Sequence, residues 1–195
     1  YKNDLIPHSI ITDDERKGID EYAAGNIAIF STGPQYLTQI KENAPDVYKD
    51  TLTSEGITGK SGLHNMSVQG LVIPKQSKHQ KAAIKLALFI TNPKNEVEFS
   101  KLTTIYPSNK KAIEDPYFTQ LPKNPEPTDR ARITGAKELE NSEVLVDFKG
   151  NTAVANELQQ ALFDALQKSM LGKLSPKEAV QEAESNWNKI LENNK

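Results

Sequence analysis

The residues best suited to chemistry in this sequence lie at Ser31–Tyr36, where hydroxyl, amide and aromatic side chains follow the apolar run Ile27–Phe30. A short continuous apolar run that ends in a Gly-Pro turn is typical of a strand buried on both faces. We expect a helix to begin just after this turn, so that free backbone amides meet Gln35 and Tyr36 at the carboxyl end of a strand. Such a set suits a neutral polyhydroxylated ligand, which needs planar hydrogen-bonding groups and a ring face. An ordinary strand-to-helix turn would need only Gly33 and Pro34 and explains the pattern equally well.

Other reactive residue types form no recognisable site. The three histidines share no short spacing with one another or with an acidic pair, so we predict no metal site. The acidic run at residues 13–15 is explained by a first helical turn, where negative charge is favourable. The serines between residues 54 and 67 lack a nucleophile motif, and the glycines between 56 and 62 lack the strand-to-helix frame of a phosphate loop. We therefore predict no catalytic residue and no cofactor.

Composition excludes several further classes of protein. The 195 residues are 36% hydrophobic and 26% charged, with a formal net charge of -2 and no cysteine. A net charge near zero gives no general electrostatic attraction to nucleic acid or to a membrane surface. No apolar run approaches the roughly 20 residues of a membrane span. The absence of cysteine excludes disulfides and thiolate metal sites. The sequence starts at Tyr1 without an initiator Met or a signal-peptide profile, so we expect a preceding part to have been removed.

The elements that must position these residues are mostly helices. Capping residues, prolines and glycine stops predict helices over 12–24, 34–42, 81–90, 93–105, 128–140, 151–171 and 175–191, with a short one from Pro107. Ile27–Phe30 and Leu71–Ile73 are the predicted strands, and residues 43–63 and 115–128 are predicted to be loop and extended crossing segments. Capping boxes are expected at Thr12, Ser77 and Ser175.

Two features indicate that the chain is incomplete as a folding unit. Strands of the buried type require neighbouring strands, and only two are predicted, so part of the sheet is expected to be absent from this chain. The helix over 81–90 is apolar on nearly every side and needs more than one partner to cover it. It begins beside a basic cluster at Lys75, Lys78, His79 and Lys81, which is either a docking patch or a solvated rim.

The ordered set of these segments resembles one protein family. The stretches 22–34, 71–79 with 82–91, 106–108 and 175–179 are similar in order and separation to the extracellular solute-binding proteins of sugar-type ABC importers, the maltose-binding-protein-like group. The resemblance implies an α/β, periplasmic-binding-protein-like two-lobe fold, of which this chain is the helix-rich second lobe plus the last portion of the first. It implies residues 1–64 and 120–195 in the second lobe, residues 65–119 in the first, and hinge passages at 64–70 and 116–127.

The resemblance also implies a function and a site. The protein would bind a sugar or oligosaccharide between the lobes and deliver it to ABC permease subunits in the membrane. It would work in the periplasm or outside the cell, where an N-terminal lipoprotein anchor could hold it, and its first half would be a partner of this chain. The implied ligand-binding residues are Ser31, Gly33, Pro34, Gln35, Tyr36, Asn65, Gln69, Asp147, Phe148 and Asn151.

One departure from the family concerns ring stacking. Several members carry Trp after Gly-Pro, where this chain has Gln35, so stacking would fall to Tyr36, Phe148 or the other half. Two other functional classes stay open: a carbohydrate-active enzyme, which needs two positioned carboxylates, and a helical interaction domain that uses the apolar helix over 81–90.

Overall fold

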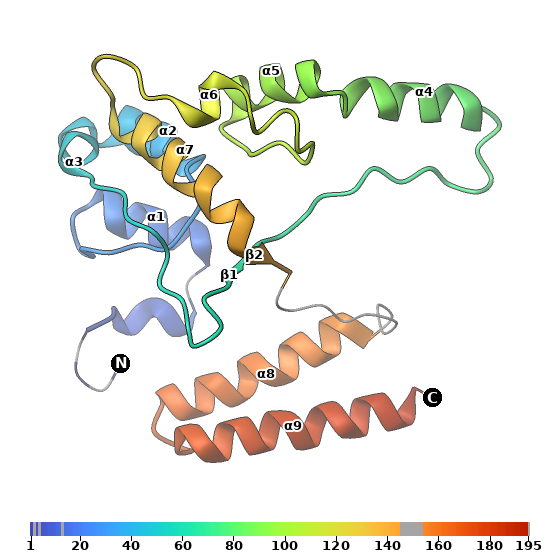
Figure 1. Cartoon of the computed structure of the whole chain (residues 1–195). Coiled ribbons are helices and arrows are strands. Elements are labelled where there is room, and N and C mark those ends of the chain that lie inside the picture. Colours follow the sequence, from blue (N-terminus) through green and yellow to red (C-terminus); the bar gives the residue numbers. More distant parts are fainter. Residues whose placement is uncertain (2, 4, 13, 145–153, 195) are drawn as a thin grey trace. The chain divides into compact units, whose positions relative to one another are not determined.

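The computed structural model describes residues 1, 3, 5–12, 14–144 and 154–194 (Figure 1). The chain divides into two compact units, Tyr1–Gly18 with Val146–Lys195, and Ile19–Leu145. We call the first the terminal unit and the second the central unit, and describe each by itself.

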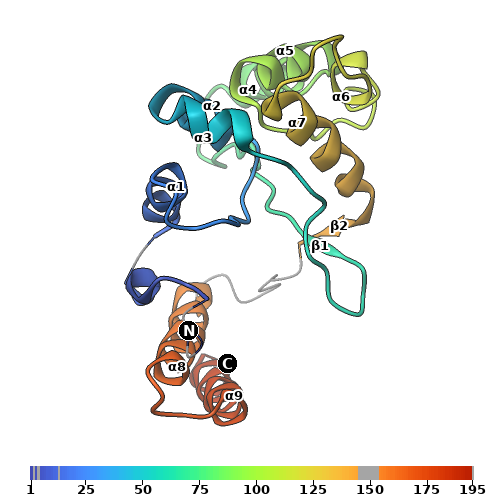
Figure 2. The ribbon, with the colours of Figure 1, turned by 90° about the vertical axis from the view of Figure 1, so that its left-hand side faces the viewer.

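The terminal unit is built on a helical hairpin, which Figures 1 and 2 show as two adjacent helices, α8 (Ala155–Met170) and α9 (Pro176–Asn193). Small side chains form its centre: Ala165, Ala179 and Ala183 are buried and let the two helices approach closely. The Trp187 indole donates a hydrogen bond of 2.6 Å to the Leu158 carbonyl across the hairpin. A short 3-10 helix, η1 (His8–Ile11), joins this unit because the Gln167 side-chain amide donates to the Ile11 carbonyl at 2.9 Å.

The central unit contains the remaining elements. In chain order these are α1 (Glu15–Ala23), which straddles the unit boundary, α2 (Tyr36–Asn43), α3 (Pro45–Asp50), β1 (His64–Asn65), α4 (Gln80–Ile90), α5 (Pro93–Thr103), α6 (Pro116–Thr119), α7 (Pro127–Glu138), the 3-10 helix η2 (Leu139–Asn141) and β2 (Ser142–Glu143). β1 and β2 form a two-stranded parallel ladder in which His64 lies opposite Ser142 and Asn65 opposite Glu143.

Two apolar clusters hold the central unit, and α7 contributes to both. The first is formed by Ile19, Leu37, Ile40, Tyr48 and Ala131, which brings α1, α2, α3 and α7 together. The second is formed by Val97, Ala112, Phe118 and Ala136, which joins α5 and α6 to the other end of α7. Because α7 lies in both clusters, it fixes α2 with respect to α5 within this unit.

Helix ends marked by glycine or proline agree with the sequence prediction. α1 and α8 both end in a left-handed glycine, with φ +77° at Gly25 and +74° at Gly172. The following amides bond back to carbonyls five residues earlier, from Asn26 to Glu21 and from Lys173 to Lys168, as in a Schellman motif. α5 and α9 begin at the predicted prolines, and the capping box at Ser175 is formed.

Two of the three predicted capping boxes are wrong. α1 begins later than predicted, where the Asp14 carboxylate accepts from the Lys17 amide at 2.9 Å and the Thr12 hydroxyl instead donates to the Ser9 carbonyl. α4 has no side-chain cap, and the Ser77 hydroxyl accepts from the His79 amide in a turn before the helix. Neither start carries a proline at the first helical position, which would fix φ and define where the helix begins.

The predicted strands are wrong as well. Residues 27–30 and 71–73 are not assigned to strands, and Ile29 and Val72 are 84% and 88% exposed. A strand exists only where a neighbour accepts and donates its backbone hydrogen bonds, and the described residues provide such a ladder only between β1 and β2. A short apolar run therefore indicates a segment that is able to pair as a strand. It does not show that a neighbouring strand is present.

Three local features were not predicted correctly. α3 lies inside the predicted loop 43–63, and α6 lies inside the predicted extended segment 115–128. The helix predicted from Pro107 is a turn, because the buried Glu96 carboxylate accepts from the Ser108 hydroxyl at 2.8 Å and from the Asn109 amide at 2.7 Å. Among the described residues, no helix is both long enough and apolar enough to span a bilayer.

The Ser175 capping box should contribute measurably to the hairpin. Ser175→Ala removes the acceptor of the Glu178 amide and should lower the free energy of unfolding by about 1 kcal/mol. Urea unfolding followed by the fluorescence of Trp187, the only tryptophan, reports on this unit. Ser185→Ala, at an exposed interior position of α9, is the matched control and should not lower the unfolding midpoint, because alanine is the stronger helix former there. Equal midpoints for Ser175→Ala and the parent would show that the box contributes nothing.

Candidate functional site

Ser31–Tyr36 form a corner that leads into α2, and we call this segment the Gly-Pro corner. The Leu37 amide donates to the Pro34 carbonyl at 3.1 Å and the Tyr36 amide to the Gly33 carbonyl at 3.5 Å, which turns the chain into the helix. The Gln35 side chain folds back over Gly33, so that a Cβ at residue 33 would overlap its amide group. Gly33 therefore provides the space that Gln35 occupies.

Exposure differs along the corner in a way that suits ligand contact. Ser31 is exposed, whereas Gly33, Pro34, Gln35 and Tyr36 are half-buried. Leu37 and Ile40, one turn apart on α2, are buried in the first apolar cluster, and Tyr36 packs against the edge of that cluster. Tyr36 thus packs against the core and is also partly accessible. Its ring can therefore stabilise the core or contact a ligand.

Asn65 and Gln69 lie on a different segment of the central unit. Asn65 is the last residue of β1 and is exposed, and the next amide, that of Met66, donates to the Glu143 carbonyl at 3.0 Å. Gln69 follows in an exposed extended stretch. The other three predicted ligand-binding residues, Asp147, Phe148 and Asn151, lie outside the described residues. The structure therefore gathers the corner residues and places Asn65 at the end of the ladder.

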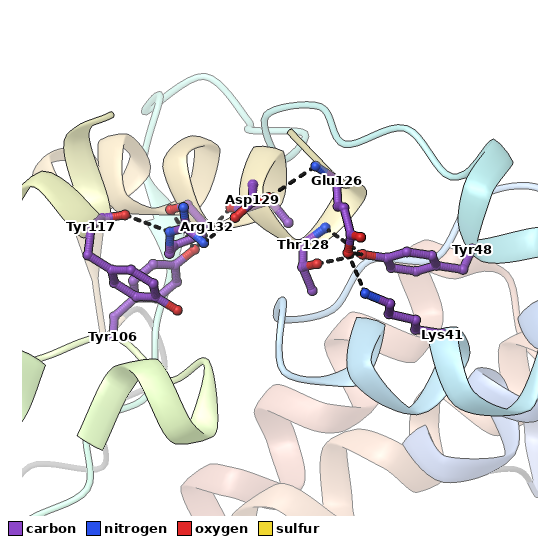
Figure 3. A network of polar contacts seen from close by, with 9 residues as sticks. Lys41, Tyr48, Tyr106, Tyr117, Glu126, Thr128, Asp129 and Arg132 are labelled. Carbon is purple, nitrogen blue, oxygen red and sulfur yellow. Dashed lines mark hydrogen bonds and ion pairs between the residues drawn. The ribbon is translucent and has the colours of Figure 1, made fainter. Parts of the chain in front are cut away.

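A network of polar contacts supports the helix that carries the corner (Figure 3). Lys41, on α2, forms an ion pair with Glu126 at the start of α7. The Tyr48 hydroxyl donates to the same Glu126 carboxylate at 3.0 Å and also bonds the Thr128 hydroxyl. Because the Tyr48 ring is only 4% exposed, these bonds join a buried side chain of α3 to the first turn of α7.

The network continues along α7 to the second apolar cluster. The Asp129 carboxylate accepts from the Glu126 amide at 3.0 Å and from the Arg132 guanidinium at 2.7 Å. The Arg132 guanidinium also donates to the Tyr117 carbonyl at 2.6 Å and lies 4.1 Å from the centre of the Tyr117 ring. The contacts of Arg132 with Tyr117 hold α6 against α7.

Three ionisable groups of the network have shifted pKa values. Hydrogen bonds from Lys41 and Tyr48 hold the pKa of the Glu126 carboxyl below its usual value, and the bond to Glu126 raises the pKa of the Lys41 ammonium. Burial, with a further contribution from the Glu138 carboxylate, raises the pKa of Tyr106, whose hydroxyl donates to the Ala131 and Arg132 carbonyls. All three groups are held in the protonation states of neutral pH, which is typical of a structural network.

Sequence reasoning missed this network. Lys41 and Glu126 are separated by 85 residues, and nothing local marks them as a pair. Only the start of α7 carried a signal, since Glu126 is followed by proline and, three residues later, by Asp129, a spacing typical of a helix N-terminus.

Comparison with known proteins assigns the chain to a family. The sequence model described as bacterial extracellular solute-binding protein matches residues 1–126, well over half of the chain. This chain belongs to the bacterial extracellular solute-binding protein family. The resemblance inferred from the sequence is thereby confirmed at the level of the family. A comparison with curated proteins gave no match.

Two solved structures share the fold of this solute-binding protein. Both are of a candidate oligosaccharide periplasmic-binding protein from Synechococcus sp. MITs9220, one of them in complex with zinc. They are 32% identical to this chain, with TM-scores of 0.85 and 0.84, and each alignment covers 97% of this chain and 48% of the other. The predicted periplasmic-binding-protein-like fold is confirmed, and the chain spans about half the length of these structures. Among the described residues, no group of three or more His, Asp or Glu side chains is arranged to hold a metal ion.

The Glu126 contacts should make the stability of the central unit depend on pH. A carboxyl whose pKa is lower in the folded than in the unfolded state stabilises the fold above its ordinary pKa, and this contribution is lost as the pH falls through the folded value. Glu126→Gln should therefore lower the urea midpoint at pH 7, and the difference from the parent should shrink as the pH falls below the ordinary carboxyl pKa of 4.5. Urea unfolding at pH 7 and at a pH below the ordinary carboxyl pKa measures the two midpoints. Hydrogen exchange of the α2 amides at the same two pH values shows whether the loss of stability lies at α2.

Glu42→Gln is the matched control, because it makes the same charge change at an exposed position of α2. It should leave the exchange rates of the α2 amides close to those of the parent at both pH values. A Glu126→Gln effect of equal size at both pH values would contradict the assignment of the ionised carboxylate as the stabilising form.

Proposed function

We propose that the chain provides one side of a sugar-binding cleft in a two-lobed solute-binding protein, and that the other side comes from residues that it does not span. The observation that carries the proposal is the Gly-Pro corner, where Ser31, Gln35 and Tyr36 present a hydroxyl, an amide and a half-buried ring at the start of an anchored helix. Hydroxyl and amide groups suit the hydroxyls of a sugar, and a tyrosine ring suits its C–H face.

Family membership and the solved relatives support the same ligand class. The family is named for binding solutes outside the cell, and the relatives are described as oligosaccharide-binding. In the same proposal the protein binds a sugar or oligosaccharide and delivers it to ABC permease subunits. It works in the periplasm or outside the cell, where a lipoprotein anchor could hold it. Asn65, Gln69, Asp147, Phe148 and Asn151 are further ligand-binding residues in the same proposal. Segments 64–70 and 116–127 are proposed as hinge passages between residues 65–119 and the other lobe.

The ligand class is tested on the full-length protein with a panel of maltose, maltotriose, sucrose, trehalose and cellobiose. Calorimetry should show that the protein binds at least one of these sugars. Chromatography of the mixture should then recover that sugar uncleaved. A cleaved product would favour the carbohydrate-active enzyme. The absence of any sugar binding, together with binding of a peptide or a polyol, would overturn the assigned ligand class.

Substitutions in the corner separate ligand contact from core packing. In the full-length protein, Tyr36→Ala should weaken sugar binding about 30-fold, corresponding to ~2 kcal/mol for a buried aromatic anchor, and Gln35→Ala should weaken it less. Thr38→Ala, at an exposed position of α2, is the control and should leave the affinity unchanged. Lower melting temperatures with unchanged sugar affinity for both corner variants would remove the corner from the binding site.

A cleft built from two lobes also predicts weak binding by this chain alone. The 195 residues would offer only part of the contacts and could not close around a ligand, so their affinity should be at least 100-fold lower than that of the full-length protein. Calorimetry with the same sugar on both proteins compares them directly. Equal affinities would place the whole site within this chain and contradict a shared cleft.

A further inference from the structure

Four lysines gather at the start of α4 with no acidic residue between them. Lys75 and Lys78 lie in the turns before the helix, and Lys81 and Lys85 lie one turn apart on it. All four side chains are exposed. The surrounding sequence, residues 56–95, contains neither aspartate nor glutamate. We call these four side chains the lysine patch.

Local hydrogen bonds keep the lysine patch together. The Ser77 amide donates to the Pro74 carbonyl at 3.0 Å, which closes the turn that contains Lys75. The side-chain amide of Gln80, the first residue of α4, donates to the Lys75 carbonyl at 2.7 Å. These bonds hold the turns that carry Lys75 and Lys78 against the start of α4, so the four positive charges belong to one ordered surface.

The charges of the lysine patch are not neutralised within the part of the chain that the structure describes. None of the four ammonium groups forms an ion pair with a described carboxylate, whereas Lys41, Lys101 and Lys168 each form one. Helix stability does not explain the lysines either, because cations are unfavourable at the positive end of the helix dipole. The first turn of α4 also has no acidic residue to balance them. A negatively charged partner would supply that balance.

The lysine patch differs in sign from the rest of the chain. Residues 75–85 carry a formal charge of +4 and the whole chain carries -2, so the other residues together carry -6. The near-zero net charge is therefore the sum of a basic surface and an acidic remainder. An anionic partner attracts the first and repels the second, which would orient the protein on that partner.

The type of basic residue indicates which anionic partner fits. Residues 56–95 contain six lysines and no arginine. Arginine has the planar group that binds one carboxylate or phosphate bidentately, whereas lysine is a flexible point charge without that geometric preference. Clusters of about four to eight exposed basic side chains are typical of surfaces that bind anionic lipid headgroups. The lysine patch therefore suits a diffuse anionic surface better than a single specific ligand.

We propose that the lysine patch binds the anionic phospholipid surface of the membrane beside which the full-length protein works, and so orients the protein there. The family is extracellular, which brings its members to a membrane surface and not to nucleic acid. Lysine ammonium groups stay in water even where apolar neighbours become covered, so the patch stays accessible in the full-length protein. The proposal rests on the extracellular location and not on the sugar ligand, so each is tested without the other.

The test measures co-sedimentation of the full-length protein, produced without lipid modification, with phospholipid vesicles. Vesicles of equal parts phosphatidylglycerol and phosphatidylcholine should bind the parent, and vesicles of phosphatidylcholine alone should not. Each lysine near an anionic membrane strengthens binding about fivefold, so changing all four to Gln should weaken binding at least 100-fold. Salt at about 1 M, which screens charges beyond about 3 Å, should abolish the binding.

The matched control changes four exposed lysines outside the patch to Gln and so alters the net charge equally: Lys110, Lys173, Lys177 and Lys189. It should bind the vesicles as the parent does, and equal unfolding temperatures of the parent and both variants verify that each is folded. An equal loss of binding in the two variants, equal binding to neutral vesicles, or no binding to phosphatidylglycerol vesicles would overturn the proposal. Binding of polyglutamate through the patch in place of the vesicles would overturn it as well, and would indicate an acidic protein as the partner.

Discussion

The arrangement of the central unit depends on the side chain of Tyr48. Its ring is buried in the cluster formed by α1, α2, α3 and α7, while its hydroxyl bonds Glu126 and Thr128 at the start of α7. A buried phenol must have a polar partner for its hydroxyl, so the position of α7 is coupled to the packing of the ring. The Gly-Pro corner takes its position from the same cluster, because α2 is anchored there through Leu37 and Ile40. Apolar packing and polar bonds at one side chain thus fix the helix that presents the corner.

The sequence predicted best those features that a few adjacent residues determine. Asn92-Pro93 and Ser175-Pro176 marked helix starts because proline fixes φ where the helix begins, and Gly25 and Gly172 marked helix ends because they adopt a left-handed conformation. Thr12 and Ser77 had the spacing of a capping box without a proline, and each formed a different local bond. Hydroxyl spacing alone did not determine where those helices start.

Features that depend on distant residues could not be predicted in the same way. Ile27–Phe30 and Leu71–Ile73 have the composition of buried strands, but their pairing depends on a neighbouring strand that no local pattern identifies. No local sequence pattern predicts the Lys41–Glu126 pair or the contacts of Glu96 with Ser108 and Asn109. At the candidate site, the turn and the start of α2 were predicted, whereas the half-buried position of Tyr36 against the core was evident only from the structure.

The ladder between β1 and β2 has a consequence for how the chain folds. His64 and Ser142 are roughly 80 residues apart in sequence, whereas α8 and α9 are joined by a five-residue turn. Closing a long loop has a larger entropic cost than closing a short one, and contacts of large sequence separation form slowly. We therefore expect the α8–α9 hairpin to form independently of the central unit, on the microsecond timescale of helix formation and short-loop closure. The parallel pair closes a loop of roughly 80 residues, so we expect it to form later than the α8–α9 hairpin.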